Sequence, residues 1–345
     1  MSAFLYSKGQ NPRVSFGLLM YLFLLPLVEA QQISSVSPRT AIVGEPIELE
    51  FTGKDLGLSG DGNLSILASF ACQQEIISEV PKPPADGKGA KTRNKVRLKV
   101  TLKEDTPVGV GWLRLVTSVG ITPPILFLVD DLPTRKADPK SRREEAILID
   151  PPLAIESRTP NLDVHYYKLE GRSGQRIAIE VFGSRLGEDV DAVLKLLDAE
   201  GRILAASDDE PGSGTDPRLS YVFSKNEPAY IEVREVRYQG GKFYRLRVGD
   251  FPLPMAAFPM VAQAGMKTSF ASVGPPGETS LSRSARMSGL YGAPSRYSLG
   301  FRGSEHNASG FVPLRLVEEP PFIEKEPNNQ LPEAHLIESS ATLTG

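Results

Sequence analysis

The sequence predicts an all-β protein made of tandem β-sandwich domains. Apolar and polar residues alternate with period two in many short stretches, as in half-buried strands. The 345 residues include 31 glycines and 29 prolines, which suit a chain of short strands and turns. The stretch Asp191–Asp209 is typical of two strands joined by a tight turn at Asp198–Gly201, where Gly201 supplies a positive φ. An apolar fraction of 40% is enough for the cores of two or three domains.

Residues 1–30 are predicted to be a signal peptide. Lys8 and Arg13 precede the apolar run Phe16–Val28, and Val28-Glu29-Ala30 is a small-residue cleavage site. The alternative is an uncleaved anchor, but the run is short for a membrane-spanning helix and is broken by Pro26. We therefore expect an exported protein, secreted or at the cell surface or in the periplasm, with no membrane span after cleavage.

The net charge and the cysteine content limit the classes of partner and the covalent cross-links that we expect. The net charge of -3 argues against nucleic acid as a partner. The single cysteine, Cys72, cannot form an internal disulfide, and its apolar surroundings predict a buried, inert thiol.

Residues 31–133 are predicted to form an immunoglobulin-like β-sandwich. Ile47, Leu49 and Phe51 alternate with glutamates, and Val96–Leu102 alternates with basic residues. Two further apolar strands are expected at 112–116 and 125–129. A length of about a hundred residues is typical of this class.

Residues 134–250 are predicted to form a second β-sandwich. The charged segment Arg135–Glu145 is interpreted as a linker at its start. A strand is expected around Ile177–Val181, followed by the Asp191–Asp209 hairpin. Tyr230–Val233 and Phe243–Val248, with Gly240-Gly241 between them, predict an antiparallel hairpin that closes the domain.

The chain then repeats itself. Residues 314–321 match 126–133, Ala334 matches Ala146, and the following positions recur with the same spacing: Pro38, Ala41, Gly44 and Gly53 as Pro259, Ala262, Gly265 and Gly274. Residues 251–321 are therefore expected to be a shortened second immunoglobulin-like segment, poorly ordered between Pro275 and Gly310. Residues 322–345 are expected to begin a second, truncated copy of the other domain.

The second domain resembles the bacterial pre-peptidase C-terminal (PPC) domain. The resemblance rests on Asp163–Tyr167, Gly174–Ile177, Asp191–Asp209, Tyr230–Val233 and Gly241–Leu246. The Glu-Pro-Asn motif that opens the family stands at Glu326-Pro327-Asn328, whereas the first copy has Asp138-Pro139-Lys140. The resemblance covers about a third of the chain and the C-terminal segment.

This resemblance implies a jelly-roll-like β-sandwich that accompanies exported enzymes, commonly peptidases. Such modules are expected to assist secretion, to bind polymers or to mediate cell-surface contacts. Several members of the family bind calcium through acidic loops.

The sequence offers one candidate metal site, for calcium. Its carboxylates are Asp189, Asp191, Asp208, Asp209 and Asp216, with Glu210 beside them. Calcium takes six to eight oxygen ligands, and antiparallel pairing would bring Asp208-Asp209 to the start of the preceding strand. The alternative is that these residues are solvated turn formers. The altered Glu-Pro-Asn motif of the first copy weakens the calcium hypothesis.

We find no catalytic set in the sequence. There are three histidines and no Gly-x-Ser-x-Gly motif, and His165 is expected to be a surface or packing residue. We therefore expect a non-catalytic binding or adhesion module for a protein or polysaccharide, stabilised by calcium if the site is real. The alternatives are the accessory N-terminal part of a longer secreted peptidase or other hydrolase, or a structural spacer.

Overall fold

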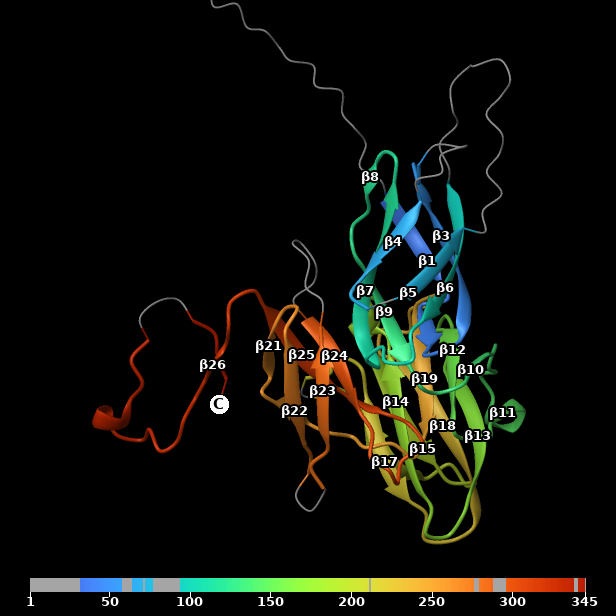
Figure 1. Cartoon of the computed structure of the whole chain (residues 1–345). Coiled ribbons are helices and arrows are strands. Elements are labelled where there is room, and N and C mark those ends of the chain that lie inside the picture. Colours follow the sequence, from blue (N-terminus) through green and yellow to red (C-terminus); the bar gives the residue numbers. More distant parts are fainter. Residues whose placement is uncertain are drawn as a thin grey trace, which may run out of the picture. The chain divides into compact units, whose positions relative to one another are not determined.

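The structure is a computed structural model. It describes the following residues: 32–57, 64–70, 72–76, 94–210, 212–275, 279–287, 296–337 and 341–344. The predicted signal peptide lies outside them. The described residues form β-strands and short 3-10 helices, which confirms the all-β prediction (Figure 1). Within this part of the chain, no helix has the length and hydropathy needed to cross a bilayer.

The first module is a two-sheet sandwich. Its strands are β1 (Gln32–Ser37), β2 (Thr40–Ile42), β3 (Pro46–Lys54), β4 (Ser65–Ala68), β5 (Cys72–Ile76), β6 (Lys95–Leu102), β7 (Gly109–Thr117), β8 (Gly120–Ile121) and β9 (Ile125–Asp130). One sheet has the order β1-β3-β6-β5, and the other contains β2, β9, β7 and β4. The predicted alternation is confirmed on β6, whose Val96, Leu98 and Val100 are buried between exposed basic residues.

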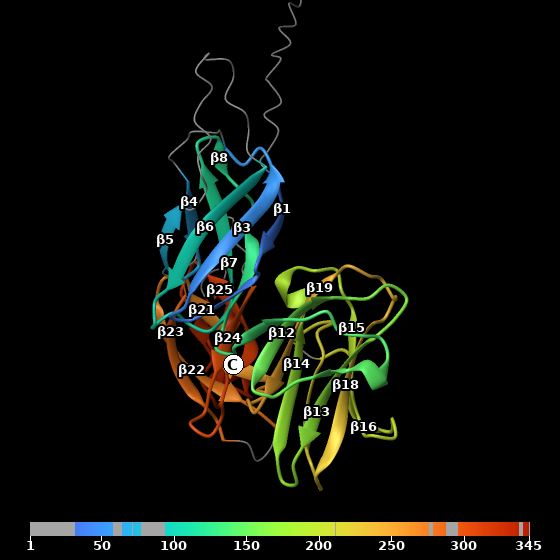
Figure 2. The same ribbon diagram turned by 90° about the vertical axis from the view of Figure 1, so that its right-hand side faces the viewer.

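The second module packs two five-stranded sheets against each other (Figure 2). Its strands are β10 (Thr134–Lys136), β11 (Ile147–Leu148), β12 (Leu153–Arg158), β13 (His165–Gly171), β14 (Arg176–Phe182), β15 (Ala192–Leu197), β16 (Ile203–Ser207), β17 (Arg218–Val222), β18 (Glu227–Glu235) and β19 (Phe243–Gly249). One sheet runs β10-β12-β19-β14-β17 and the other β11-β13-β18-β15-β16. The predicted hairpin is confirmed as β15 and β16, with Gly201 at φ 87°.

Two local predictions for this module were wrong. Arg135–Glu145 is not a free linker: it contributes β10, which pairs in parallel with β12, and the 3-10 helix η1 (Arg143–Glu145). The expected closing hairpin does not form either. β18 pairs with β13 and β15, whereas β19 pairs with β12 and β14 in the opposite sheet. Both strands bury apolar residues in one shared core, so a short crossover between the layers satisfies the same sequence pattern.

The third module repeats the strand order of the first with fewer strands. It contains β20 (Ala256–Phe258), β21 (Val261–Gln263), β22 (Lys267–Val273), β23 (Ser282–Arg286), β24 (Arg296–Phe301) and β25 (Gly310–Val317). One sheet is β20-β22-β23, and β24-β25-β21 continue the sheet of β9 and β7 through a β7–β24 pair. We expected Pro275–Gly310 to be poorly ordered. Its described residues form β23 and β24, and Leu299 and Phe301 are buried in the core of this module.

The C-terminal segment carries little secondary structure. β26 (Phe322–Ile323) pairs in parallel with β27 (Leu343–Thr344), and the 3-10 helix η3 (Leu331–Glu333) lies between them in sequence. In the alignment that pairs Ala146 with Ala334, η3 corresponds to η1.

Candidate functional site

The structure brings three of the predicted metal ligands together. Asp191 precedes β15, and Asp208 and Asp209 follow β16, so antiparallel pairing of the strands places them at one end of the hairpin. One carboxylate oxygen from each residue lies within 4.8 Å of the others. Asp191 is half-buried and the other two are exposed.

The other predicted ligands serve different contacts. Asp189 is exposed and pairs with Arg237 at 3.1 Å. Asp216 is fully buried and accepts hydrogen bonds from the backbone N–H groups of Ser184 and Arg185 at 2.7 and 2.9 Å. Glu210 pairs loosely with Arg218, at 3.7 Å.

The three clustered aspartates repel one another when all are ionised, and a bound cation would relieve that repulsion. Partial burial raises the pKa of Asp191, and the negative charges of Asp209 and Asp208 raise it further. With one oxygen from each aspartate, the cluster supplies three of the six to eight ligands that calcium takes, so further carboxylate oxygens, water or backbone carbonyls would complete the shell. These residues could hold calcium and would supply charge and orientation there.

Further fully buried charged residues lie where the three modules meet. Arg245 and Arg247 on β19 are fully buried, as is Asp130 at the end of β9. Arg245 Nη2 lies 2.6 Å from Asp130 Oδ2, and Arg247 Nη2 lies 3.1 Å from Asp130 Oδ1. Burial raises the pKa of Asp130, but the charges of Arg247 and Arg245 outweigh it and leave the pKa below its usual value. The single negative charge of Asp130 therefore partly compensates the positive charges of both Arg245 and Arg247.

Further contacts extend this buried network in both directions. Arg247 Nη1 lies 2.9 Å from Glu180 Oε2, and Arg247 Nη2 donates to the carbonyl of Ser309 in the third module at 2.7 Å. Arg245 Nη1 lies 3.4 Å from Glu156 Oε1, and the hydroxyl of Thr40 in the first module donates a hydrogen bond to the same carboxylate. Because buried charges are costly unless they are paired, the network favours one arrangement of the modules.

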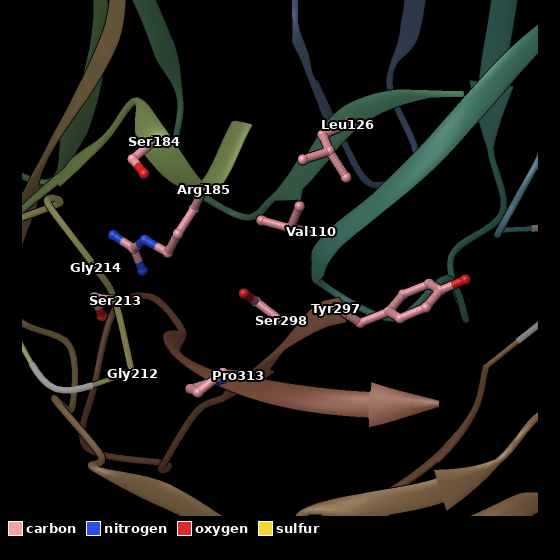
Figure 3. Close-up of a pocket in the computed structure, with 10 residues that line it drawn as sticks. All are labelled: Val110, Leu126, Ser184, Arg185, Gly212, Ser213, Gly214, Tyr297, Ser298 and Pro313. Atoms are coloured by element: carbon pink, nitrogen blue, oxygen red, sulfur yellow. The ribbon is translucent and has the colours of Figure 1, made fainter. Parts of the chain in front are cut away.

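A pocket of about 290 Å³ lies beside this network, and all three modules line it (Figure 3). Val110 and Leu126 come from the first module. Figure 3 shows Ser184 and Ser298 on opposite sides of the cavity, with their hydroxyl groups directed toward its interior. Gly212 and Pro313 close another side, and a Cβ on Gly212 would lie 3.1 Å from the ring of Pro313. Gly212 also has a φ of +82°, which favours glycine, and a side chain here would need the ring of Pro313 to shift slightly.

The pocket presents hydroxyl groups but little free charge. Arg185 lines it, yet its guanidinium donates to Asp216 at 2.9 Å, to Glu180 at 2.8 Å and to the Val181 carbonyl at 2.7 Å. Burial lowers the pKa of Arg185, but the two carboxylates outweigh it and raise the pKa above its ordinary value. Arg185 therefore stays protonated, and its positive charge is already compensated by Asp216 and Glu180. This environment suits a neutral ligand that bears hydroxyl groups.

The histidines have structural contacts. His165 is buried, and its Nδ1 lies 2.7 Å from the hydroxyl of Tyr244, which in turn lies 2.6 Å from the hydroxyl of Tyr167. The ring of His335 packs edge-on against Phe322. The ring nitrogen of His306 lies 3.4 Å from Asp250.

Sequence reasoning missed both the buried network and the pocket. Arg245 and Arg247 alternate with Tyr244, Leu246 and Val248, so the pattern favoured an apolar inner face and a charged outer face. The inner face is correct, since these three apolar residues lie in the module's core. The other face is covered by neighbouring modules. The available signal was the pair of aspartates Asp130-Asp131, which end an apolar strand.

Comparisons with known proteins give distant similarities of fold. No protein-family model matches the sequence, and no curated protein matches it. The pre-peptidase C-terminal domain of collagenase from Bacillus anthracis is 19% identical and matches 32% of this chain and 99% of that chain, with a TM-score of 0.27. PliG, a periplasmic inhibitor of g-type lysozyme from Aeromonas hydrophila, is 12% identical over 33% of this chain and 96% of that chain, with a TM-score of 0.25. The secreted serine protease VesC from Vibrio cholerae is 11% identical over 63% of this chain and 49% of that chain, with a TM-score of 0.21. The chain thus has a distant structural similarity to the PPC domain of a collagenase and to other bacterial β-sandwich proteins.

Proposed function

We propose that this chain is a non-catalytic binding module of an exported protein, and that the pocket at the junction of its three modules takes a neutral, hydroxyl-bearing ligand such as a sugar residue of a polysaccharide. The observation that carries the proposal is the composition of the pocket. Ser184, Ser213 and Ser298 supply hydroxyl groups, while Val110, Leu126 and Pro313 supply apolar walls. Sugars combine hydroxyl groups with apolar C–H faces, so such a surface matches both.

The buried network supports the same proposal because it holds the pocket walls in place. The pocket exists only while the three modules keep their arrangement. Arg245 and Arg247 form ion pairs with Asp130 of the first module, and Arg247 also donates a hydrogen bond to the Ser309 carbonyl of the third. A site with walls fixed in advance loses less conformational entropy when it binds.

Binding is tested by titrating the protein with soluble oligosaccharides of several classes and measuring heat by calorimetry. The variant Ser184→Trp fills the pocket from the 3-10 helix η2 (Ser184–Leu186) and should abolish the heat of binding. The matched control is Ser220→Trp, which places the same side chain on an exposed position of β17 and should bind normally. Absence of binding to every sugar class would refute the ligand class, and equal binding by both variants would refute the location.

We also propose that calcium binds at Asp191, Asp208 and Asp209 and stabilises this end of the β15–β16 hairpin. The convergence of the three carboxylates and the raised pKa of Asp191 support this role. It is separate from ligand binding, because none of the three lines the junction pocket.

A further inference from the structure

Among the described residues, the shortened third module has no strand on a sheet edge that the first module covers with β5. In the first module the sheet order is β1-β3-β6-β5, so β5 pairs with the edge of β6 that faces away from β3. In the third module the corresponding sheet is β20-β22-β23. The described residues between β22 and β23, 274–275 and 279–281, form no counterparts of β4 and β5, and β23 is the edge strand of the described sheet.

The two sheets can be compared residue by residue. The repeat aligns Gly44 with Gly265 and therefore Pro46 with Lys267. Pro46 pairs with Thr101 on β6, and Lys267 pairs with Arg286 on β23, so Arg286 takes the place of Thr101. In the first module, Thr101 faces Gln73 of β5, and Lys99 faces Glu75.

The backbone of β23 offers hydrogen-bonding groups at this edge. Ser272 N–H donates to the carbonyl of Leu281 at 2.7 Å, which makes 272 and 281 a hydrogen-bonded pair. Hydrogen-bonded and non-hydrogen-bonded pairs alternate along an antiparallel ladder. The backbone N–H and C=O groups of residues 283 and 285 therefore bond to β22, whereas those of 282, 284 and 286 point away from β22, toward the free side of β23. The hydroxyls of Ser269 and Ser284 lie 2.8 Å apart, as the closer side-chain spacing of a non-hydrogen-bonded pair predicts.

The charges at this edge select the chemistry of a partner. Lys267 and Arg286 are both exposed and lie directly opposite each other. Like charges in that position repel, and an acidic residue on an added strand beside Arg286 would relieve the repulsion. We propose that β23 binds an extended segment of a partner protein in the place that β5 occupies in the first module, with an acidic side chain opposite Arg286. Main-chain hydrogen bonds would supply affinity, and the paired charges would set the register.

The test uses the full chain and a fluorescent peptide with the sequence of β5, Cys72–Ile76, flanked by threonines. The peptide carries Cys72→Ser, to prevent oxidation, and Gln73→Glu, to place a carboxylate opposite Arg286. We expect saturable binding by fluorescence anisotropy, and slower amide hydrogen exchange over 282–286. A peptide with Gln73→Lys should bind more weakly, by a factor of about two to thirty.

Ser284→Pro removes one outward N–H without touching the ladder to β22, because proline is tolerated on the solvent side of an edge strand. It should abolish peptide binding, whereas Ser284→Ala, which also loses the contact with Ser269, should bind normally. Arg286→Glu should reverse the preference between the two peptides. Hydrogen exchange on β22 would show whether Ser284→Pro disturbs folding. If it does, Arg286→Glu still tests the proposal.

Three results would overturn the proposal. They are absence of saturable binding, equal binding of the acidic and basic peptides, and concentration-dependent self-association that Ser284→Pro abolishes. The last result, measured by light scattering, would make a second copy of this chain the occupant.

Discussion

Arg245 donates two hydrogen bonds to Asp130, from Nε at 2.9 Å and from Nη2 at 2.6 Å, and neither side chain is accessible to solvent. The pair joins β19 of the second module to the end of β9 in the first. Because ion pairs lose solvation when they are buried, this contact contributes less to net stability than to the choice of arrangement. Any other orientation of the modules would leave buried charges without partners. Arg247, beside Arg245 on β19, also donates to the Ser309 carbonyl of the third module at 2.7 Å, so the buried network favours one arrangement of all three modules.

Asp130→Asn should strongly destabilise the protein, because it leaves Arg245 and Arg247 buried with less negative charge. Breaking a buried pair typically costs about 3–5 kcal/mol of unfolding free energy. Urea unfolding followed by circular dichroism measures the change. The control is Asp150→Asn at an exposed position, which should change stability by no more than about 0.5 kcal/mol. Equal effects of the two substitutions would contradict a structural role for the pair.

The stability of the second module should fall as the pH falls from 6.5 toward 4. Burial lowers the pKa of His165 from 6.5 to about 4, although Asp138 and Asp163 partly oppose this. Between these values the unfolded chain binds a proton at this residue that the folded chain does not, so protonation favours unfolding. His165→Gln should flatten the dependence of the unfolding free energy on pH over this window. His335→Gln, in the C-terminal segment, is the matched control for removing a histidine outside this module.

Calcium should raise the melting temperature, and a chelator should lower it again. The change follows from selective binding to the folded state, in which Asp191, Asp208 and Asp209 converge. The double variant Asp208→Asn/Asp209→Asn should lose the calcium response, while Asp189→Asn should keep it, since Asp189 pairs with Arg237 instead. The response should also weaken as the pH falls toward the raised pKa of Asp191, because protons compete with the cation. A melting temperature that calcium does not change would remove the metal from the proposed function.

Alternation and turn chemistry were sufficient to predict several elements of this fold, but not all of them. The β15–β16 hairpin and the buried face of β6 both follow from residues close together in sequence. Alternation shows which side chains lie inside a sandwich, but it does not identify the partner strand. For this reason β18 and β19 were expected to pair with each other, although they lie in opposite sheets.

The candidate sites also differ in whether their residues lie close together in sequence, and only the local ones were predictable. The meeting of Asp191 with Asp208 and Asp209 depends on one local hairpin and was predictable. Asp216 also lies close in sequence, but it turns inward because the backbone N–H groups at the start of η2 need an acceptor. The pocket requires Val110, Ser184 and Ser298 to meet, and their distance in sequence leaves no local signal.

Tyr297→Phe should weaken the contact between the first and third modules. Trp112 lies on β7 of the first module but packs in the core of the third, where its indole N–H donates to the hydroxyl of Tyr297 at 2.6 Å. Removing that hydroxyl leaves a buried donor without this acceptor, which typically costs about 1–3 kcal/mol. Trp112 is the only tryptophan in the sequence, so its fluorescence reports unfolding at this contact. The urea midpoint measured by fluorescence should fall for Tyr297→Phe and should not change for Tyr238→Phe, whose side chain is exposed. If the midpoint is unchanged in both variants, the Trp112–Tyr297 hydrogen bond does not stabilise the contact between these modules.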